Sequence, residues 1–210
     1  MNRDREAERW EEDYSRRGRV WGGAVHNLPP LSRGERVLEL GCGNGKTSRA
    51  ILGLTSDVVG IDLSASAVRL CRAHAPGSSG GQLALADARS LPFFDAVFDA
   101  VVAFHVIGHL PAEGRARSAH EAARVLRAGG TLFFSGFSPE DFRAGTGCET
   151  EPGTFVRKNG IATHYFTEDE VLALFQGLTP CECATRRWTM TVRGQTLPRA
   201  EIGATFKKNP

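Results

Sequence analysis

The sequence predicts an α/β protein of one domain, residues 1–210, built on a mostly parallel sheet. Short runs rich in Val, Ile, Leu and Phe alternate with segments whose apolar residues recur at helical spacing. A turn with three glycines joins the first of these runs to the next helical segment, as a strand joins a helix in a doubly wound sheet. A chain of this length buries about 70% of the surface that its unfolded form exposes, so one core suffices.

Composition narrows the class of protein. Lys and Arg number 26 against 24 Asp and Glu, for a net charge of +2, and this balance lacks the electrostatic footprint of a dedicated nucleic-acid binder. The N-terminus is charged almost throughout, and no apolar run approaches the roughly 20 residues that span a bilayer. Five cysteines without a CxxC pair suit reduced thiols. We expect a cytoplasmic protein that binds neither nucleic acid nor a membrane.

The first 30 residues form a distinct N-terminal segment. Arg5–Arg17 is a predicted amphipathic helix on which Trp10 and Tyr14, four residues apart, share one face. Gly18 ends this helix, and Trp21 follows in a glycine-containing stretch. Two interpretations are open: the rings pack on the core as an apolar patch, or residues 1–30 close over a site as a lid that excludes water.

The chain is organised around a strand, a glycine turn and a helix. Arg36–Leu40 is the strand and Lys46–Leu54 the helix, and between them stand Gly41, Gly43 and Gly45. Without a Cβ, these glycines can adopt positive φ and let a ligand approach the main chain closely. A phosphate-binding GxxxxGK[ST] loop requires a glycine at Leu40, and a dinucleotide GxGxxG turn requires one at Lys46. Neither pattern fits.

The second strand, Asp57–Asp62, ends in a carboxylate about 20 residues beyond the glycine turn. In doubly wound sheets an acidic residue at this place can accept hydrogen bonds from both ribose hydroxyls of a nucleotide. The alternative role for Asp62 is to cap the following helix, Ala65–Ala75, but Ser64 can serve as that cap. The spacing therefore favours a ligand that contains adenosine.

Two more strands follow. Gln82–Ala86 is a weak third strand and ends at Asp87, which on its own is equally well explained as a turn-forming residue. Phe98–Phe104 is nearly continuous in apolar residues, as expected for a central parallel strand buried on both faces.

The next part of the chain contains a long helix and a long connection. The helix is Ala112–Arg127, with Gly129 and Gly130 as a C-cap, and the fifth strand is Thr131–Gly136. From residue 137 to residue 165 the regular spacing is lost, so we expect an irregular insertion. Connections of this length are usually functional, and this one begins at the ligand-binding edge of the sheet.

The C-terminal part begins with a helix and ends with two strands. Thr167 and Glu170 form a predicted capping box at the start of the helix. The strands are Thr179–Val192 and Arg199–Lys207, antiparallel to each other and joined by residues 193–198.

Four segments in this order resemble the class I S-adenosylmethionine-dependent methyltransferases, in particular type-11-like small-molecule enzymes. They are Glu39 followed by the glycine turn, then Asp62, then Asp87–Phe93, and finally Arg124–Leu132. The N-terminal residues Trp10–Tyr14 and Trp21 are similar to a segment of small-molecule methyltransferases that include enzymes acting on thiols and chalcogen oxyanions. The resemblance implies a Rossmann-like, doubly wound sheet of seven strands with a C-terminal antiparallel pair.

The resemblance also implies S-adenosyl-L-methionine as cofactor and S-adenosyl-L-homocysteine as product. The glycine turn would hold the methionine half, Asp62 the ribose and Asp87 the exocyclic amine of adenine. The implied cofactor-binding residues are Tyr14, Trp21, Glu39, Gly41, Cys42, Gly43, Asp62, Leu63, Asp87, Ala88, Ala103 and Phe104.

Methyl transfer needs mainly an acceptor atom held in line with the leaving sulfur, because the methyl group is already electrophilic. A base is needed only where the acceptor carries a proton that it would not otherwise lose, and the candidates are His105, His109, His164 and Tyr165. His105 and His109 are not expected to bind a metal, since Gly108 and Pro111 interrupt the helix between and after them.

The acceptor is expected to be a small molecule, with thiols and chalcogen compounds as one class. Its binding region is predicted in residues 137–165, where the candidate polar contacts are Arg157, Lys158, His164 and Tyr165. The alternatives are an RNA or protein methyltransferase, a nicotinamide oxidoreductase, which the glycine spacing disfavours, and a non-catalytic S-adenosylmethionine-binding protein. The sequence is compatible with a monomer or a homodimer.

Overall fold

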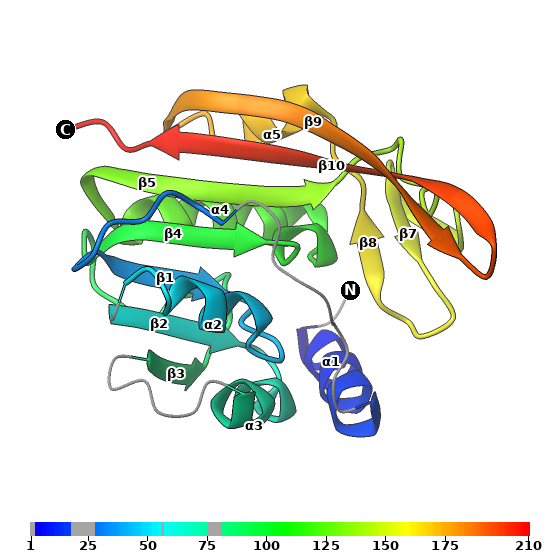
Figure 1. The fold of residues 1–210 in the computed structure, drawn as a ribbon, viewed down its shortest axis with the longest axis horizontal. Helices are drawn as coiled ribbons and strands as arrows, with labels where there is room; N and C mark the ends of the chain where they lie inside the picture. The colour runs from blue at the N-terminus through cyan, green and yellow to red at the C-terminus, as the bar shows by residue number, and fades with distance from the viewer. Residues whose placement is uncertain (1–2, 18–27, 56, 75–80) are drawn as a thin grey trace.

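The computed structural model of the chain describes residues 3–17, 28–55, 57–74 and 81–210. Its centre is a seven-stranded sheet with strand order β3-β2-β1-β4-β5-β10-β9, and helices cover both faces (Figure 1). The first five strands are parallel, β10 is antiparallel to β5, and β9 is antiparallel to β10. The predicted doubly wound sheet with a C-terminal antiparallel pair is confirmed. Because the chain winds outward from β1 and β4, ligands are expected at the carboxyl ends of these strands.

The elements have the following bounds. The large sheet contains β1 (Arg36–Leu40), β2 (Asp57–Asp62), β3 (Gly81–Leu85), β4 (Phe98–Phe104), β5 (Leu126–Phe137), β9 (Thr179–Val192) and β10 (Gln195–Lys207). A small antiparallel sheet contains β6 (Cys148–Glu151), β7 (Thr154–Val156) and β8 (Ala162–His164). The helices are α1 (Arg3–Arg17), α2 (Lys46–Ile51), α3 (Ala65–His74), α4 (Ala112–Val125), α5 (Glu168–Leu174) and the 3₁₀ turn η1 (Ile107–His109). None of the helices in the described ranges is long and apolar enough to cross a bilayer.

Alternation along the strands divides the core between the two faces of the sheet. On one face Leu38 and Val101 pack with Val125 of α4. On the other face Val37 and its neighbours pack with Ile51 of α2. Figure 1 shows α4 and α5 behind the sheet and α2 in front of it. Each fully buried aliphatic side chain of this kind stabilises the fold by about 1.5–3 kcal/mol, so the two layers fix the strand ends that carry the site.

The helix before β5 ends earlier than expected. α4 stops at Val125, and Leu126 is already extended, with φ −68° and ψ 136°. The side chain of Leu126 is fully buried, and its backbone pairs with Phe98 of β4. The core contact therefore draws the chain into the strand, and Gly129 and Gly130 lie within β5. The prediction that these glycines form a helix C-cap was wrong.

The region from residue 137 to residue 165 is not irregular throughout, contrary to the prediction. It contains the three short strands of the small sheet, which lies near the carboxyl ends of the large sheet (Figure 1). Strands of three or four residues are too short to show a period of two in the sequence. A buried cross-strand pair, Thr154 with His164, holds β7 against β8.

The C-terminal hairpin turns more tightly than expected. Only Arg193 and Gly194 form the turn, with φ of 49° and 79°, as a two-residue hairpin requires. The remaining residues of the predicted loop pair with β9. Pro198 is tolerated in β10 because β5 pairs only as far as Glu201, so β5 requires no N–H from Pro198, whose carbonyl accepts from the Phe142 N–H at 3.0 Å. The hairpin consequently extends beyond β5 (Figure 1).

Most of the other helices and strands begin and end at the residues predicted from local sequence patterns. β1, β2, β4 and β9 have the expected bounds. The capping box of α5 is confirmed, since the Thr167 hydroxyl accepts a hydrogen bond from the Glu170 N–H and the Glu170 carboxylate accepts one from the Thr167 N–H. α2 ends at Ile51, three residues before the predicted end.

Candidate active site

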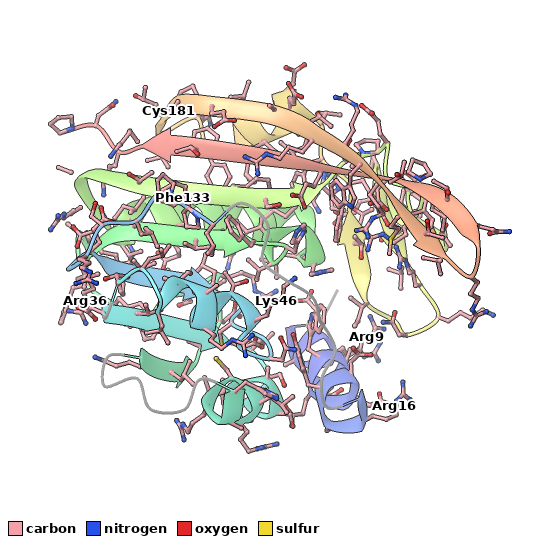
Figure 2. The ribbon with its side chains drawn as sticks, viewed as in Figure 1. Arg9, Arg16, Arg36, Lys46, Phe133 and Cys181 are labelled. Carbon is pink, nitrogen blue, oxygen red and sulfur yellow. The ribbon has the colours of Figure 1, made fainter. Side chains whose placement is uncertain are left out.

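A cavity of about 1080 Å³ opens at the carboxyl ends of β1, β2 and β4 and continues over β5, β10 and β9. Figure 2 labels three of its lining residues, Lys46 of α2, Phe133 of β5 and Cys181 of β9, which mark its extent across the sheet. Sites for single small ligands usually have volumes of about 300–1,000 Å³. This cavity is therefore large enough for a cofactor and an acceptor side by side.

The glycine turn forms one end of the cavity. Gly41 and Gly43 have φ of 70° and 53°, which favours glycine. A Cβ at Gly41 would lie 2.8 Å from Val106 Cγ2, and one at Gly43 would lie 2.7 Å from Tyr14 Oη. The Cys42 N–H donates to the Ile61 carbonyl at 2.8 Å and ties the turn to β2. The turn thus presents main chain to the cavity.

Asp62 lies between the glycine turn and the start of α3. One carboxylate oxygen accepts from the Gly43 N–H and the other from the Ser64 N–H, each at 2.9 Å. Burial raises the pKa of Asp62, although these backbone N–H groups oppose the shift. The Ser64 hydroxyl accepts from the Ala67 N–H and so caps α3, as the sequence predicted. Ser64 therefore supplies the cap of α3, and the carboxylate of Asp62 lines the cavity.

Asp87 also lines the cavity, but it has a partner that the sequence analysis did not identify. Arg89 Nε and Nη2 each lie 3.0 Å from an oxygen of Asp87, and Arg89 Nη1 donates to Glu6 of α1 at 2.7 Å. Burial raises the pKa of Glu6, while the charge of Arg89 opposes this effect. The ion pairs connect the strand end at Asp87 to the N-terminal helix.

Not all of the predicted cofactor residues reach the cavity. Tyr14, Cys42, Leu63, Ala88 and Phe104 line it together with the residues described above. Glu39 is buried behind the turn, where it accepts a hydrogen bond from the Ser48 hydroxyl and burial raises its pKa well above the usual value. Ala103 is fully buried within β4. Trp21 lies outside the described residues.

Helix α1 lines one side of the cavity and is fastened at three points. Glu6 binds Arg89, the Arg9 guanidinium donates to the Gly160 carbonyl at 2.7 Å, and Glu11 accepts from the Ser64 hydroxyl at 2.7 Å. Arg9 is labelled in Figure 2, beside the loop between β7 and β8. Trp10 packs edge-on against His109 with ring centres 4.9 Å apart. The two aromatic residues of α1, Trp10 and Tyr14, thereby face the cavity.

Two of the four candidate bases line the cavity, and two do not. His105 lines the cavity with 35% of its side chain exposed, and its Nε2 lies 3.2 Å from Glu201 Oε2. Its ring stacks on Phe137 with centres 4.4 Å apart, and its φ of 54° is unusual for a residue with a Cβ. His109 lines the cavity too, but loss of hydration lowers its pKa to about 4 and its Nδ1 bonds to the Ala162 carbonyl.

The other two candidates lie away from the cavity. Burial lowers the pKa of His164 to about 4, and its Nδ1 lies 2.8 Å from the Thr154 hydroxyl. The Tyr165 hydroxyl accepts from Arg157 at 2.7 Å. None of the predicted acceptor contacts, which also include Lys158, lines the cavity. Among the described residues, no group of three or more His, Cys, Asp or Glu side chains is arranged to hold a metal ion.

The cavity wall beyond His105 contains residues that the sequence analysis did not single out, although Phe137 and Arg143 belong to the predicted acceptor region, residues 137–165. They come from β5, the segment after it and the hairpin, and they are Phe137, Arg143, Arg186, Trp188, Arg199 and Glu201. Alternation along β10 could have found two of them, because Arg199 and Glu201 point to the opposite face from the buried Ile202, Ala204 and Phe206.

The order of the parallel strands, the glycine turn at β1 and the acidic residue at the end of β2 define the class I S-adenosylmethionine-dependent methyltransferases, and the chain belongs to this class. Its cofactor is S-adenosylmethionine. The family model described as "Methyltransferase domain" matches residues 38–134, from β1 to β5.

Individual relatives agree with this assignment. The chain is 31% identical over 159 residues to malonyl-[acyl-carrier protein] O-methyltransferase of Methylococcus capsulatus, covering 75% of the chain and 55% of the relative. It is 29% identical over 199 residues to a tRNA N(3)-cytidine methyltransferase of Danio rerio, covering 86% and 56%. A solved S-adenosylmethionine-dependent methyltransferase from Methanosarcina mazei superposes with a TM-score of 0.72 at 25% identity, covering 88% of this chain and 99% of that one. The chain spans about half the length of these two curated relatives.

Proposed function

We propose that this protein transfers the methyl group of S-adenosylmethionine to a small-molecule acceptor, with thiols and chalcogen compounds among the candidates. The observation that carries the proposal is the continuous cavity that runs from the glycine turn past His105 to the hairpin, lined on one side by the fastened α1 helix. A cavity of this size beside the glycine turn suits an acceptor small enough to enter it.

The residues present fit the cofactor. The glycine turn is a cradle that a Cβ at Gly41 or Gly43 would fill, and we assign it to the methionine half. The carboxylate of Asp62 keeps lone pairs beyond the two that accept backbone N–H groups, which suits ribose hydroxyls. Asp87 is assigned to the adenine amine, with Arg89 beside it. When bound, the cofactor supplies a methyl carbon that is already activated by the sulfonium charge.

The protein contributes mainly position and proton transfer. The acceptor atom must lie about 3 Å from the methyl carbon and in line with the sulfur, which binding in a rigid cavity achieves. Where the acceptor carries a proton, His105 is the group placed to accept it, because it lines the cavity beside the glycine turn. Glu201 positions the imidazole through its contact with Nε2. The docked α1 helix excludes water through Trp10 and Tyr14.

The test is a methyl-transfer screen with labelled S-adenosylmethionine across thiols, selenite, tellurite, phenols, carboxylates and amines. Calorimetry with S-adenosylhomocysteine measures the cofactor site independently of turnover. We expect product binding in the micromolar range and transfer to at least one small acceptor. Binding of NADH in place of S-adenosylhomocysteine would contradict the proposed function.

The second candidate function is methylation of RNA. Relatives that methylate tRNA support it, as does an arginine-rich hairpin that contains Arg186, Arg187, Arg193 and Arg199. The same screen should include bulk tRNA at two salt concentrations, because binding to phosphates weakens steeply as salt rises. Transfer to tRNA with none to small acceptors would favour this second function.

A further inference from the structure

The acceptor end of the cavity is built on one face of three neighbouring strands. In the register of the sheet, Glu201 of β10 stands opposite Phe137 of β5 and Arg186 of β9, and Arg199 stands opposite Trp188. Alternation places these residues on the same face, away from the buried core. They form a continuous wall with Arg143, which enters from the segment after β5.

A buried carboxylate fixes two of the arginines. Asp141 has a fully buried side chain, and both Arg143 Nε and Arg199 Nε donate to it at 2.6 Å. Burial opposes ionisation of Asp141, but the two guanidinium groups outweigh it and lower its pKa. Each guanidinium has five N–H donors in a rigid fork, and the Asp141 bonds use only some of them. Arg143 and Arg199 are therefore oriented in advance, with donors remaining at the cavity that both residues line.

Arg186 adds a third positive charge to the same wall. A Cβ at Gly203 would lie 3.1 Å from its guanidinium carbon, so the absent side chain lets Arg186 lie flat over β10. At this end the lining arginines are Arg143, Arg186, Arg187 and Arg199, and the lining carboxylates are Glu182 and Glu201. Asp141 stands behind Arg143 and Arg199, and Glu140 pairs with the exposed Arg187. The guanidinium donors of Arg143, Arg186 and Arg199, gathered in a partly enclosed space, favour a negatively charged ligand.

Aromatic rings line the path between this charge and the methyl-transfer end. Phe137 stacks on His105 with centres 4.4 Å apart, and the Arg143 guanidinium carbon lies 3.9 Å from the same ring centre. The imidazole centre and the Arg143 guanidinium are therefore at most about 8.3 Å apart. Trp188 lies 5.3 Å from the Arg199 guanidinium. Guanidinium groups thus stand beside aromatic rings along this wall, which suits a ligand that carries both an aromatic ring and an anionic group.

We propose that the methyl acceptor is an aromatic carboxylate, whose carboxylate binds Arg143, Arg186 and Arg199 and whose acceptor oxygen or sulfur faces His105. This inference rests on the proposed function and specifies its substrate class. In the reaction a lone pair of the acceptor atom forms the bond to the methyl carbon, and the carbon–sulfur bond breaks with its electron pair going to sulfur. The acceptor's proton passes to His105, and the carboxylate is unchanged.

The first test measures binding without turnover. The protein, saturated with S-adenosylhomocysteine, is titrated calorimetrically with 4-hydroxybenzoate and with 4-hydroxybenzamide, which differ mainly in charge. We expect the carboxylate to bind at least tenfold more tightly, because charge-assisted bonds to arginine are among the strong hydrogen bonds of proteins. Equal affinity for the two compounds would overturn the inference.

Matched variants locate the effect. Arg186→Gln and Arg199→Gln should each weaken 4-hydroxybenzoate binding about tenfold and leave 4-hydroxybenzamide binding unchanged. Arg117→Gln removes the same charge from an exposed ion pair on α4, outside the cavity, and should change neither. If Arg199→Gln does not fold because Asp141 loses a partner, Arg186→Gln decides the question. Unchanged 4-hydroxybenzoate affinity in Arg186→Gln would count against the site.

Turnover separates this inference from the proposed function. 4-Mercaptobenzoate and 4-mercaptobenzamide offer the same sulfur, and we expect kcat/KM to favour the carboxylate at least tenfold. Equal rates with the two compounds would refute the carboxylate site while confirming methyl transfer. Loss of S-adenosylhomocysteine binding would instead count against the proposed function. If neither compound is methylated, the binding comparison above still decides whether the carboxylate site exists.

Discussion

Substitution of Gly43 by alanine tests the contact between the glycine turn and helix α1. The residue has φ of 53°, and a Cβ would lie 2.7 Å from Tyr14 Oη. The left-handed conformation costs an L-residue about 1–2 kcal/mol. The overlap adds a further penalty, because Tyr14 belongs to a helix fastened at three points and has little room to retreat.

The two contributions can be separated with Tyr14→Phe. Removing the hydroxyl leaves Tyr14 Cζ as the nearest atom of that ring, at 3.6 Å, which is an ordinary van der Waals contact. In the Tyr14→Phe background, Gly43→Ala should therefore cost only the backbone share, about 1 kcal/mol. In the parent it should cost about 1 kcal/mol more, a coupling energy typical of residues in contact.

Thermal or urea unfolding of the four proteins of this double-mutant cycle measures the free energies of unfolding, and calorimetry with S-adenosylhomocysteine follows the site. If Gly43→Ala costs the same in both backgrounds, Tyr14 does not contact the turn in solution. The docked position of α1 beside the glycine turn would then be refuted.

Three further predictions concern single residues. Although partial burial opposes it, hydrogen bonding by Ser66 and Ser64 lowers the pKa of Glu11 to about 2 from 4.5. This stabilisation is present above pH 4.5 and is lost as the pH falls toward 2. Glu11→Gln should therefore lower the free energy of unfolding by about 1 kcal/mol at pH 7, after discounting for solvent screening, and change it little near pH 2. Urea unfolding at both pH values measures the difference. Asp62→Ala should weaken S-adenosylhomocysteine binding by about 1–3 kcal/mol, because ribose hydroxyls lose their acceptor; unchanged affinity in calorimetry would exclude Asp62 from the site. With an acceptor that carries a proton, His105→Ala should lower kcat by about 10²–10⁴-fold at unchanged cofactor affinity, whereas equal kcat would exclude it as a base.

Local patterns in the sequence predicted the parallel half of the sheet and the turn after β1 well. The glycine turn and Asp62 were found because their signal lies in a few contiguous residues: a strand, a required φ, and an acidic strand end. The capping box of α5 was found for the same reason. Such features depend on backbone geometry that neighbours in the chain determine among themselves.

Features that depend on distant residues were beyond this kind of prediction. Asp141 and Arg199 are 58 residues apart, and Glu6 and Arg89 are 83 apart, so no local spacing shows that they meet. Glu39 illustrates the opposite case. It stands at the family position, but the strand that carries it turns its carboxylate toward Ser48, behind the turn, and away from the cavity.

The contacts that hold α1 in place also reach residues that we assign to the cofactor site. Glu6 contacts Arg89, which binds Asp87, the residue that we assign to adenine. Glu11 contacts Ser64, whose N–H donates to Asp62, the residue that we assign to ribose. A ligand that strengthens or weakens these contacts changes the free energy of helix docking. By reciprocity, helix docking changes the affinity for that ligand by the same factor. We therefore expect the release of S-adenosylhomocysteine and the detachment of α1 to be energetically coupled.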